Sequence, residues 1–352
     1  MKYGISLLPE CTPDKRSAAT YFDDVLRLSQ LGEEVGLDYV KMTEHYLHPA
    51  GGYCPSPLIF LAAVAARNRR IRLMTGGIQA SFHNPIQLAA ETAQVDAMSQ
   101  GRLDVGFARA FLPHEFDAFG VDINTSRERF RVTVDTVIRL WSEQNISVYT
   151  PFFSFENATS LPRPIQQPHP PVWICALMSE SSFRWAGERG FNLLMTSSPQ
   201  PERIPLVREL VDVYRSAFQK HHGAPSRRPQ VAVSLPLIAA DTDEEAMDIA
   251  KPFVQHHMDV WRDATKPLLT NESSDYAGYS DAVGKAFSAS VEEHAKMFVI
   301  GSPETIARRI EELHEGLSVD VILWLLDAGC QHYKTMERSL RLFEKALALT
   351  SN

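Results

Sequence analysis

The sequence predicts an α/β fold, a (β/α)8 TIM barrel with excursions after strands 4 and 7. Short apolar runs rich in branched residues alternate with amphipathic stretches of helical length, which is typical of parallel βα units. Eight such pairs follow one another, and the first run leads into Leu8-Pro9-Glu10-Cys11 without the glycines of a dinucleotide-binding fold. We therefore expect one barrel domain over residues 1–352.

Eight segments have the length and composition of buried parallel strands. In order they are residues 3–8, 39–43, 71–78, 103–108, 172–176, 192–196, 230–239 and 319–326.

Between the strands, apolar residues recur at helical spacing. The expected helices are residues 18–35, 58–67, 86–98, 127–141, one beginning near 179, 201–221, one beginning after 241–243, 303–317 and 334–349. Gly36 suits a left-handed helix end, and Ser302-Pro303 places an N-cap before a proline at the first helical position.

Two segments interrupt this rhythm. Residues 142–170 hold several prolines and short alternating runs, so we expect a hairpin outside the barrel. Residues 262–290 are rich in Ser, Asp, Gly and Tyr and form the second excursion.

Composition excludes several classes. The net charge of −8 and the pI of about 5.9 argue against nucleic-acid binding, which needs a basic face. No apolar run is long enough to span a membrane, and the first residues carry no secretory pattern, so we expect a cytoplasmic protein without a membrane partner. The four cysteines are scattered, which indicates neither a zinc site nor a disulfide framework.

In such a barrel the active site lies at the carboxyl ends of the strands. The candidate residues follow strands 2 to 5; they are Glu44, His45, Thr75, Gly76, Gly77, Arg109, Phe111, His114, Ser179 and Ser182. Ser179 and Ser182 begin a helix, where free N–H groups and the helix dipole favour a phosphate, and Arg109 could clamp the same group. Alternatively, Ser179 is only an N-cap.

The glycine pair allows a flat ring to approach the backbone, or it is a simple bend. His45 suits general acid–base chemistry near neutral pH, although many lone histidines are core residues. His45, His48, His83 and His114 show no metal-binding helical spacing, so we expect no metal site.

Several motifs together resemble one known family. They are Thr43-Glu44-His45-Tyr46, Thr75-Gly76-Gly77-Ile78 with His83-Asn84-Pro85, residues 94–109 (QVDAMSQGRLDVGFAR), 115–120 (EFDAFG), Ser179-Glu180-Ser181-Ser182 with Trp185-Ala186, and 299–304 (VIGSPE). The sequence resembles the bacterial luciferase-like flavin-dependent monooxygenases over nearly its whole length. The resemblance implies that reduced FMN binds at the barrel mouth and reacts with O2 to a flavin 4a-hydroperoxide, which oxygenates a small organic substrate.

By position, His45 resembles the family's base near the flavin, and Glu44 the adjacent acid. Arg109, Ser179 and Ser182 resemble the phosphate contacts, and Thr75 to Gly77 the strand behind the flavin ring, often with a non-proline cis peptide. In a regular strand His45 and Glu44 would point to opposite faces. We therefore expect a turn at residue 44, with His45 facing the flavin and Glu44 making a local polar contact beneath it.

Two features concern substrate and partners. Ala108 stands where bacterial luciferase carries a reactive cysteine, which weakens an aldehyde–luciferase assignment. The chain has no nucleotide-binding motif, so a separate flavin reductase should supply the reduced FMN. The family usually forms a homodimer near strands 2 and 3, which makes residues 58–66 the candidate face; alternatively, this helix packs only on its own barrel.

Three rival functions remain. Some relatives bind a deazaflavin and transfer hydride without oxygen chemistry. Others are non-catalytic flavin-binding proteins, which the presence of Glu44, His45 and Arg109 together argues against. A metal-dependent barrel hydrolase is the third.

Overall fold

Eight parallel strands close into a barrel in the computed structural model, which describes residues 1–352 except 197–198, 224–227, 271–272, 274–275, 277 and 351–352. Around the barrel they are β1 (Lys2–Leu7), β2 (Tyr39–Met42), β3 (Arg72–Thr75), β5 (Leu103–Ala108), β8 (Val172–Ala176), β9 (Asn192–Met195), β10 (Val231–Ala239) and β12 (Val321–Leu325). Pairing of β12 with both β10 and β1 closes the ring, which confirms the predicted fold class.

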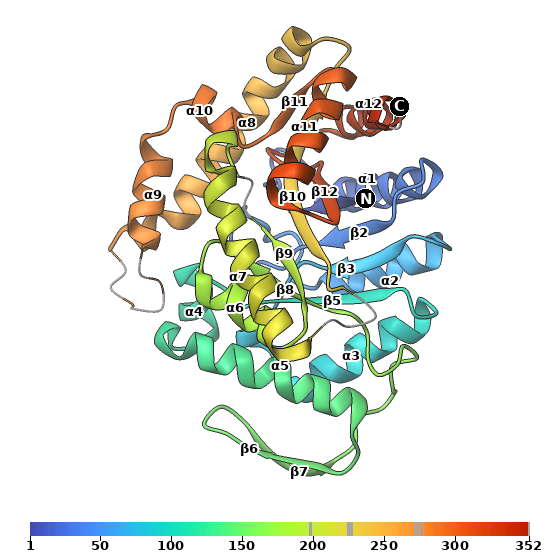
Figure 1. Ribbon diagram of the computed structural model, residues 1–352, viewed down its shortest axis with the longest axis vertical. Helices are drawn as coiled ribbons and strands as arrows, with labels where there is room; N and C mark the ends of the chain where they lie inside the picture. Colours follow the sequence, from blue (N-terminus) through green and yellow to red (C-terminus); the bar gives the residue numbers. More distant parts are fainter. Residues whose placement is uncertain (197–198, 224–227, 271–272, 274–275, 277, 351–352) are drawn as a thin grey trace.

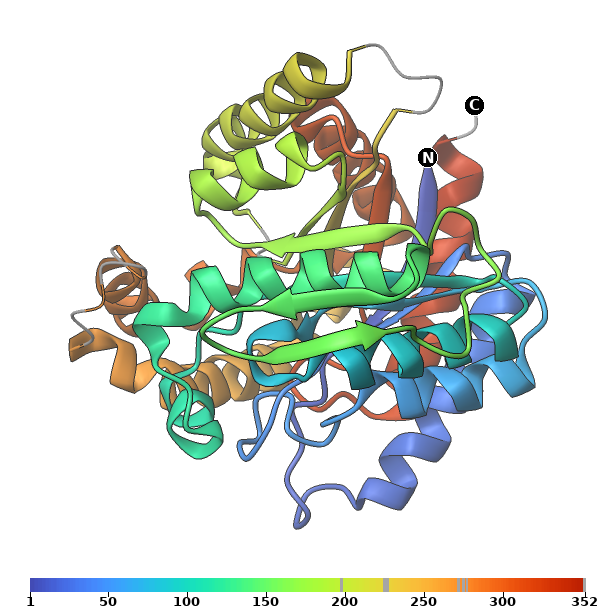
Figure 2. The ribbon, with the colours of Figure 1, turned by 90° about the horizontal axis from the view of Figure 1, so that it is seen from below.

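Helices surround this barrel (Figure 1). They are α1 (Ala18–Glu34), α2 (Pro57–Arg67), α3 (Pro85–Met98), α5 (Ser126–Ser142), α6 (Glu180–Glu188), α7 (Ile204–His222), α8 (Asp243–Thr265), α11 (Pro303–Leu317) and α12 (Tyr333–Thr350). The expected N-cap of α11 is present, because Ser302 Oγ accepts from Thr305 N, and Thr242 Oγ1 caps α8 by accepting from Glu245 N. The last helix lies beside the first strand (Figure 2), where the rings of Tyr3 and Phe343 are 5.2 Å apart.

The expected third strand is divided in two. Gly76-Gly77 forms a cis peptide bond between β3 and the short β4 (Ile78–Gln79), which continues the pairing with β5. The loop after β5 contains α4 (Pro113–Phe119), which sequence analysis did not predict.

Both excursions have regular structure. The first holds the antiparallel hairpin of β6 (Ile146–Tyr149) and β7 (Ser154–Ala158), which lies beyond α5 in Figure 1. The second begins inside α8 and contains α9 (Tyr279–Ser288), followed by α10 (Val291–Ala295). A short strand, β11 (Val299–Gly301), then extends the sheet beside β10.

One disulfide corrects the expectation drawn from cysteine spacing. Cys11 and Cys330 are bonded, with their Cα atoms 5.3 Å apart, although 319 positions separate them in sequence. They meet because β1 and β12 are neighbours in the closed barrel. Sequence spacing says nothing about a pairing that barrel closure creates.

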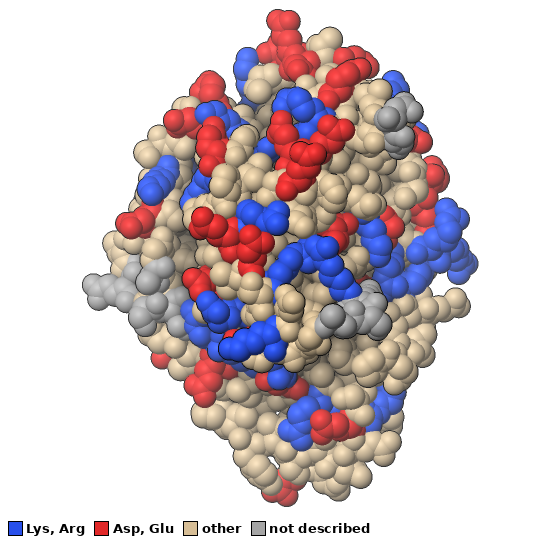
Figure 3. Space-filling view, in the orientation of Figure 1, with Lys and Arg blue, Asp and Glu red and all other residues tan. Residues whose placement is uncertain are grey.

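The surface carries mixed charges. Figure 3 shows acidic and basic side chains interspersed over the face that it displays. No helix within the described residues is long and apolar enough to cross a membrane.

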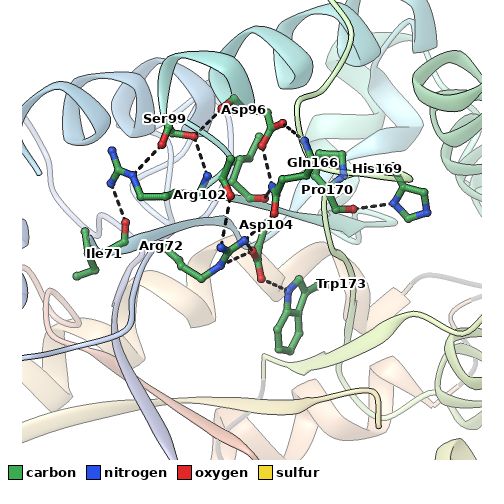
Figure 4. A network of polar contacts seen from close by, with 12 residues as sticks. Ile71, Arg72, Asp96, Ser99, Arg102, Asp104, Gln166, His169, Pro170 and Trp173 are labelled. Carbon is green, nitrogen blue, oxygen red and sulfur yellow. Dashed lines mark hydrogen bonds and ion pairs between the residues drawn. The ribbon is translucent and has the colours of Figure 1, made fainter. Parts of the chain in front are cut away.

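A polar network occupies the end of the barrel where the strands begin (Figure 4). The Asp104 carboxylate accepts from the Arg72 guanidinium and from Trp173 Nε1, the latter at 2.8 Å. Gln166 connects this pair to Asp96, whose carboxylate accepts from the Gln166 side chain at 2.7 Å. Asp96 and Asp104 belong to the motif over residues 94–109, so part of that motif serves the fold.

Candidate functional site

A cavity of about 410 Å³ opens at the carboxyl ends of the strands. This volume lies within the range of ligand pockets. Side chains that follow β2, β3, β5 and β8 line it together with side chains of α8, α9 and α10. Every predicted site residue lines this cavity except Thr75 and His114.

His45 is held by a carboxylate. β2 ends at Met42, so the regular strand is over before residue 44, and the Glu44 and His45 side chains both line the cavity. His45 Nδ1 lies 3.0 Å from Glu115 Oε1, which also accepts from Tyr46 N at 2.8 Å and Gln79 Nε2 at 3.1 Å. Because the carboxylate accepts a hydrogen bond from Nδ1–H, the other ring nitrogen, Nε2, is left for a ligand.

Glu44 contacts a different histidine. Its Oε1 accepts from His83 Nε2 at 2.7 Å and from the Tyr46 hydroxyl at 2.8 Å. Burial lowers the pKa of His83, but the hydrogen bond and charge of Glu44 outweigh it and raise that pKa above its usual value. Glu44 thus makes a local polar contact, but the acid that orders His45 is Glu115.

The glycine pair is surrounded closely. A Cβ on Gly76 would overlap the Lys41 side chain, and one on Gly77 would lie 2.6 Å from Cys175 Sγ. Lys41 is buried beneath them, donating to Ser6 Oγ at 3.1 Å and Thr43 Oγ1 at 2.8 Å. Burial lowers the pKa of Lys41 to about 8.

The predicted phosphate residues lie together on the cavity wall. Ser179 is at the N-cap position of α6, but its hydroxyl does not cap the helix and instead contacts Ser181 Oγ at 3.0 Å. Ser179 is thus the N-cap residue of α6, as the alternative expected, although its hydroxyl makes no cap hydrogen bond. The Arg109 guanidinium lies 4.1 Å from the centre of the Tyr276 ring.

Phe111 and Thr75 have different surroundings. Phe111 lines the cavity, stacks on Trp261 with ring centres 6.2 Å apart, and meets the His45 ring edge-on. The Thr75 hydroxyl donates to Gly106 O at 2.9 Å and accepts from Gly106 N at 2.8 Å. Thr75 does not line the cavity; its hydroxyl joins β3 to β5 through these two bonds, and its part in cofactor binding stays a prediction.

Sequence reasoning missed several cavity residues. They are Lys41, Gln79, Trp261, His257, His294 and, behind the wall, Glu10 and Glu115. A lysine inside an otherwise apolar strand and a glutamate just after strand 1 were signals that strand-end reasoning could have used. His257 and Trp261 carried no such signal, since both lie on a helix that was expected to cover the outside of the barrel.

No cluster of three or more His, Cys, Asp or Glu side chains in the described part of the chain is arranged to hold a metal ion. Three of the four histidines considered as ligands contact a carboxylate instead: His45 contacts Glu115, His48 contacts Asp263 and His83 contacts Glu44.

Comparison with known proteins shows the family of this chain. The sequence model of the family of luciferase-like monooxygenases matches residues 1–319. The chain belongs to this family. The oxygenase component of a flavin-dependent trigonelline monooxygenase from Acinetobacter baylyi is 26% identical over 344 residues, covering 94% of this chain and 90% of that protein.

Solved structures extend the likeness. Monooxygenase RslO1 from Streptomyces bottropensis matches with a TM-score of 0.83 and 31% identity over 100% of both chains. The oxygenating constituent of a 3,6-diketocamphane monooxygenase from Pseudomonas putida, solved with FMN, has a TM-score of 0.81 at 20% identity, covering 99% of this chain and 98% of that one. That second likeness shows the shared fold. Enzymes dependent on F420 are also among the similar proteins.

Proposed function

We propose that this luciferase-like protein is an FMN-dependent monooxygenase that oxygenates a small organic substrate. One observation carries the proposal: a single cavity joins a helix start with Arg109, a flat glycine backbone and a carboxylate-oriented histidine. The relatives named as flavin-dependent or FMN-bound oxygenase components support this reading.

The residues fit the two ends of FMN. Arg109, Ser179 and Ser182 would hold the phosphate, because the start of α6 and a cationic side chain line the same cavity. The flat ring would lie against Gly76 and Gly77, where no side chain projects. Reduced FMN would supply the oxygen chemistry, with a flavin 4a-hydroperoxide as the oxygenating species.

His45 would act as the acid or base beside the flavin. Its Nδ1 is engaged by Glu115, so Nε2 is the nitrogen that would move a proton to or from the reacting centre. Glu44 would keep the neighbouring loop in place through His83 and Tyr46.

Rapid mixing of the reduced protein–FMN complex with oxygen tests this function. We expect the absorbance of a flavin hydroperoxide before that of oxidised FMN. We also expect a separate flavin reductase as the electron source, so the protein alone with NADPH, FMN and oxygen should oxidise negligible NADPH. Direct reoxidation without the intermediate would count against the mechanism, and rapid NADPH oxidation against the reductase.

A second candidate is deazaflavin-dependent hydride transfer, which the F420-dependent relatives favour. Titration of each cofactor, followed by its fluorescence, separates the two functions. Quenching of F420 but not FMN would replace the proposal. FMN binding without substrate-dependent oxygen consumption would instead indicate a non-catalytic flavin protein.

The homodimer and the cytoplasmic location also stay proposals. On α2, Ile59 is 75% exposed, whereas Leu58, Phe60 and Leu61 are buried in the same chain, so Ile59 is the residue that a partner would cover. A monomeric mass at micromolar concentration would contradict the dimer.

A further inference from the structure

A second carboxylate–histidine pair lies at the same cavity as His45. Glu10 follows β1 and is fully buried, and its Oε1 accepts from His257 Nδ1 at 2.7 Å and from Trp261 Nε1 at 2.7 Å. Its Oε2 accepts from the backbone N–H of Gly329. Both oxygens are therefore used, and the pair is as well supported as His45 with Glu115.

His257 lines the cavity and uses only one ring nitrogen for Glu10. Its Nε2, on the far side of the ring, makes no hydrogen bond with any residue that the structure describes. The His294 ring is centred 5.3 Å away, also lines the cavity, and is 7% exposed. His294 Nε2 is buried and likewise lacks a hydrogen-bond partner within the described ranges. A buried polar atom without a partner is costly, so a ligand atom is the natural partner here.

The surroundings of the two histidines are aromatic. Phe298 meets the His257 ring edge-on at 5.3 Å, and Trp261 lies between His257 and His45, with ring centres 6.2 and 6.1 Å from them. Trp261 is also stacked on Phe111. Such a wall suits a flat apolar ligand that carries one polar group near the imidazoles.

The protonation states of Glu10 and His294 indicate which kind of polar group the ligand carries. Burial raises the pKa of Glu10, but the His257 contact and the hydrogen bonds from Gly329 and Trp261 outweigh it and hold that pKa below its usual value. Burial, with His257 and Arg262 nearby, lowers the pKa of His294 to about 4, so this ring is neutral near pH 7. A negatively charged Glu10 thus lies beside His257, while neutral His294 can donate from Nε2.

We propose that His257, supported by Glu10, takes the proton of an acidic hydroxyl group on a flat substrate, a phenol or an enol, and that His294 donates to the resulting oxygen. The proton passes from the substrate O–H to His257 Nε2, and the charge of the imidazolium is balanced by Glu10 and the substrate anion. The inference rests on the proposed function, because it names the substrate class of the same cavity.

Absorbance of 4-nitrophenol in the presence of the protein and oxidised FMN tests the proposal. The wild-type protein should bind it as the coloured anion at a pH where the free probe is neutral. His257→Gln should abolish this colour and weaken binding about 10-fold or more, the range for a hydrogen bond to a charged group. The matched control is His256→Gln on the same helix, since His256 contacts Lys15 and the Glu10 backbone and does not line the cavity. It should keep the colour.

A second probe separates proton transfer from shape. 4-Nitroanisole has no acidic hydrogen, so its affinity should be the same in the wild type and in His257→Gln. The proposal is overturned if the wild type binds 4-nitrophenol in its neutral form or not at all, or if His257→Gln still yields the anion. FMN fluorescence on the same samples keeps the two claims apart. Absence of FMN binding defeats the proposed function, whereas normal FMN binding without the phenolate defeats only this inference.

Discussion

The two ends of the barrel use buried charge differently. Where the strands begin, Asp96 and Asp104 have donors for all of their carboxylate oxygens, and Arg102 donates to four backbone carbonyls. Where the strands end, Glu44 and Glu115 each leave one buried oxygen without a hydrogen bond within the described residues. The Asp96–Asp104 network is thus satisfied by protein donors, whereas Glu44, which lines the cavity, keeps an oxygen available for a ligand.

This difference separates stability from chemistry. A network that is satisfied by protein atoms stabilises the fold once it has formed, and its loss should lower the free energy of unfolding. In the cavity, carboxylates orient the histidines, and some polar atoms have no hydrogen bond from the protein. Such an arrangement suits the binding of a ligand. Substitutions at the two ends should therefore change different measured quantities.

The largest effect is expected from His45→Ala at the cavity end. Turnover should fall about 10²–10⁴-fold, because the substitution removes the acid–base group. FMN affinity should stay within a few-fold, and turnover is compared per folded molecule because His45 is a buried partner of Glu115. Steady-state turnover, FMN titration and thermal unfolding on the same preparation check this. If the variant turns over as fast as the wild type, His45 is a structural core histidine and not an acid–base group.

Asp104→Ala tests the opposite end. The free energy of unfolding should fall by about 4 kcal/mol, because Trp173 Nε1 loses its acceptor and Arg72 its partner. Turnover per folded molecule should stay close to that of the wild type. Denaturant unfolding measures the loss, and Asp104→Asn, which keeps an acceptor oxygen, should lose less. If Asp104→Ala lowers turnover but leaves the free energy of unfolding unchanged, the proposed division between a stabilising end and a functional end of the barrel is wrong.

His294, which lines the cavity, should make the free energy of unfolding depend on pH in the acid range. Its pKa is lowered from 6.5 to about 4 by burial and by His257 and Arg262, with Glu10 opposing, so the unfolded chain takes up this proton more readily. Stability from this group is therefore present above pH 6.5 and lost as the pH falls toward 4, by about 2–3 kcal/mol. His294→Phe should flatten the unfolding free energy over this window relative to the wild type. An unchanged pH slope would show that His294 is not responsible.

The smallest effect is expected from Trp173→Phe. It removes one hydrogen bond to Asp104 and keeps most of the ring, so the unfolding free energy should fall by about 1 kcal/mol. Turnover should not change. A loss as large as that of Asp104→Ala would mean that Trp173, and not Arg72, dominates the network.

The strand ends were predictable because they follow from the rhythm of apolar runs. That rhythm located His45, Gly76, Gly77, Arg109 and the start of α6 at one end of the barrel. Partners that come from distant segments were not predictable in this way. Glu115 reaches His45 from α4, and His257 reaches Glu10 across 247 positions, so neither pair has a local spacing.

The same limit applies to the contacts of Thr75 and to the disulfide. Thr75 follows the right strand, but its hydroxyl bonds to the backbone of β5, a contact that depends on the register of two strands. Cys11 and Cys330 meet only through barrel closure. Residue type and period predict the elements, whereas these contacts depend on how the elements pack.

The central claim is that the cavity binds FMN with its phosphate at Arg109 and the start of α6. The most direct test is to titrate FMN and riboflavin, which lacks the phosphate, into the wild type and Arg109→Ala by flavin fluorescence. FMN affinity should fall by about 1.5–3 kcal/mol in the variant, the range for a hydrogen bond to a charged group, while riboflavin affinity should hardly change. Equal losses for both flavins, or no loss for FMN, would contradict this placement of the phosphate.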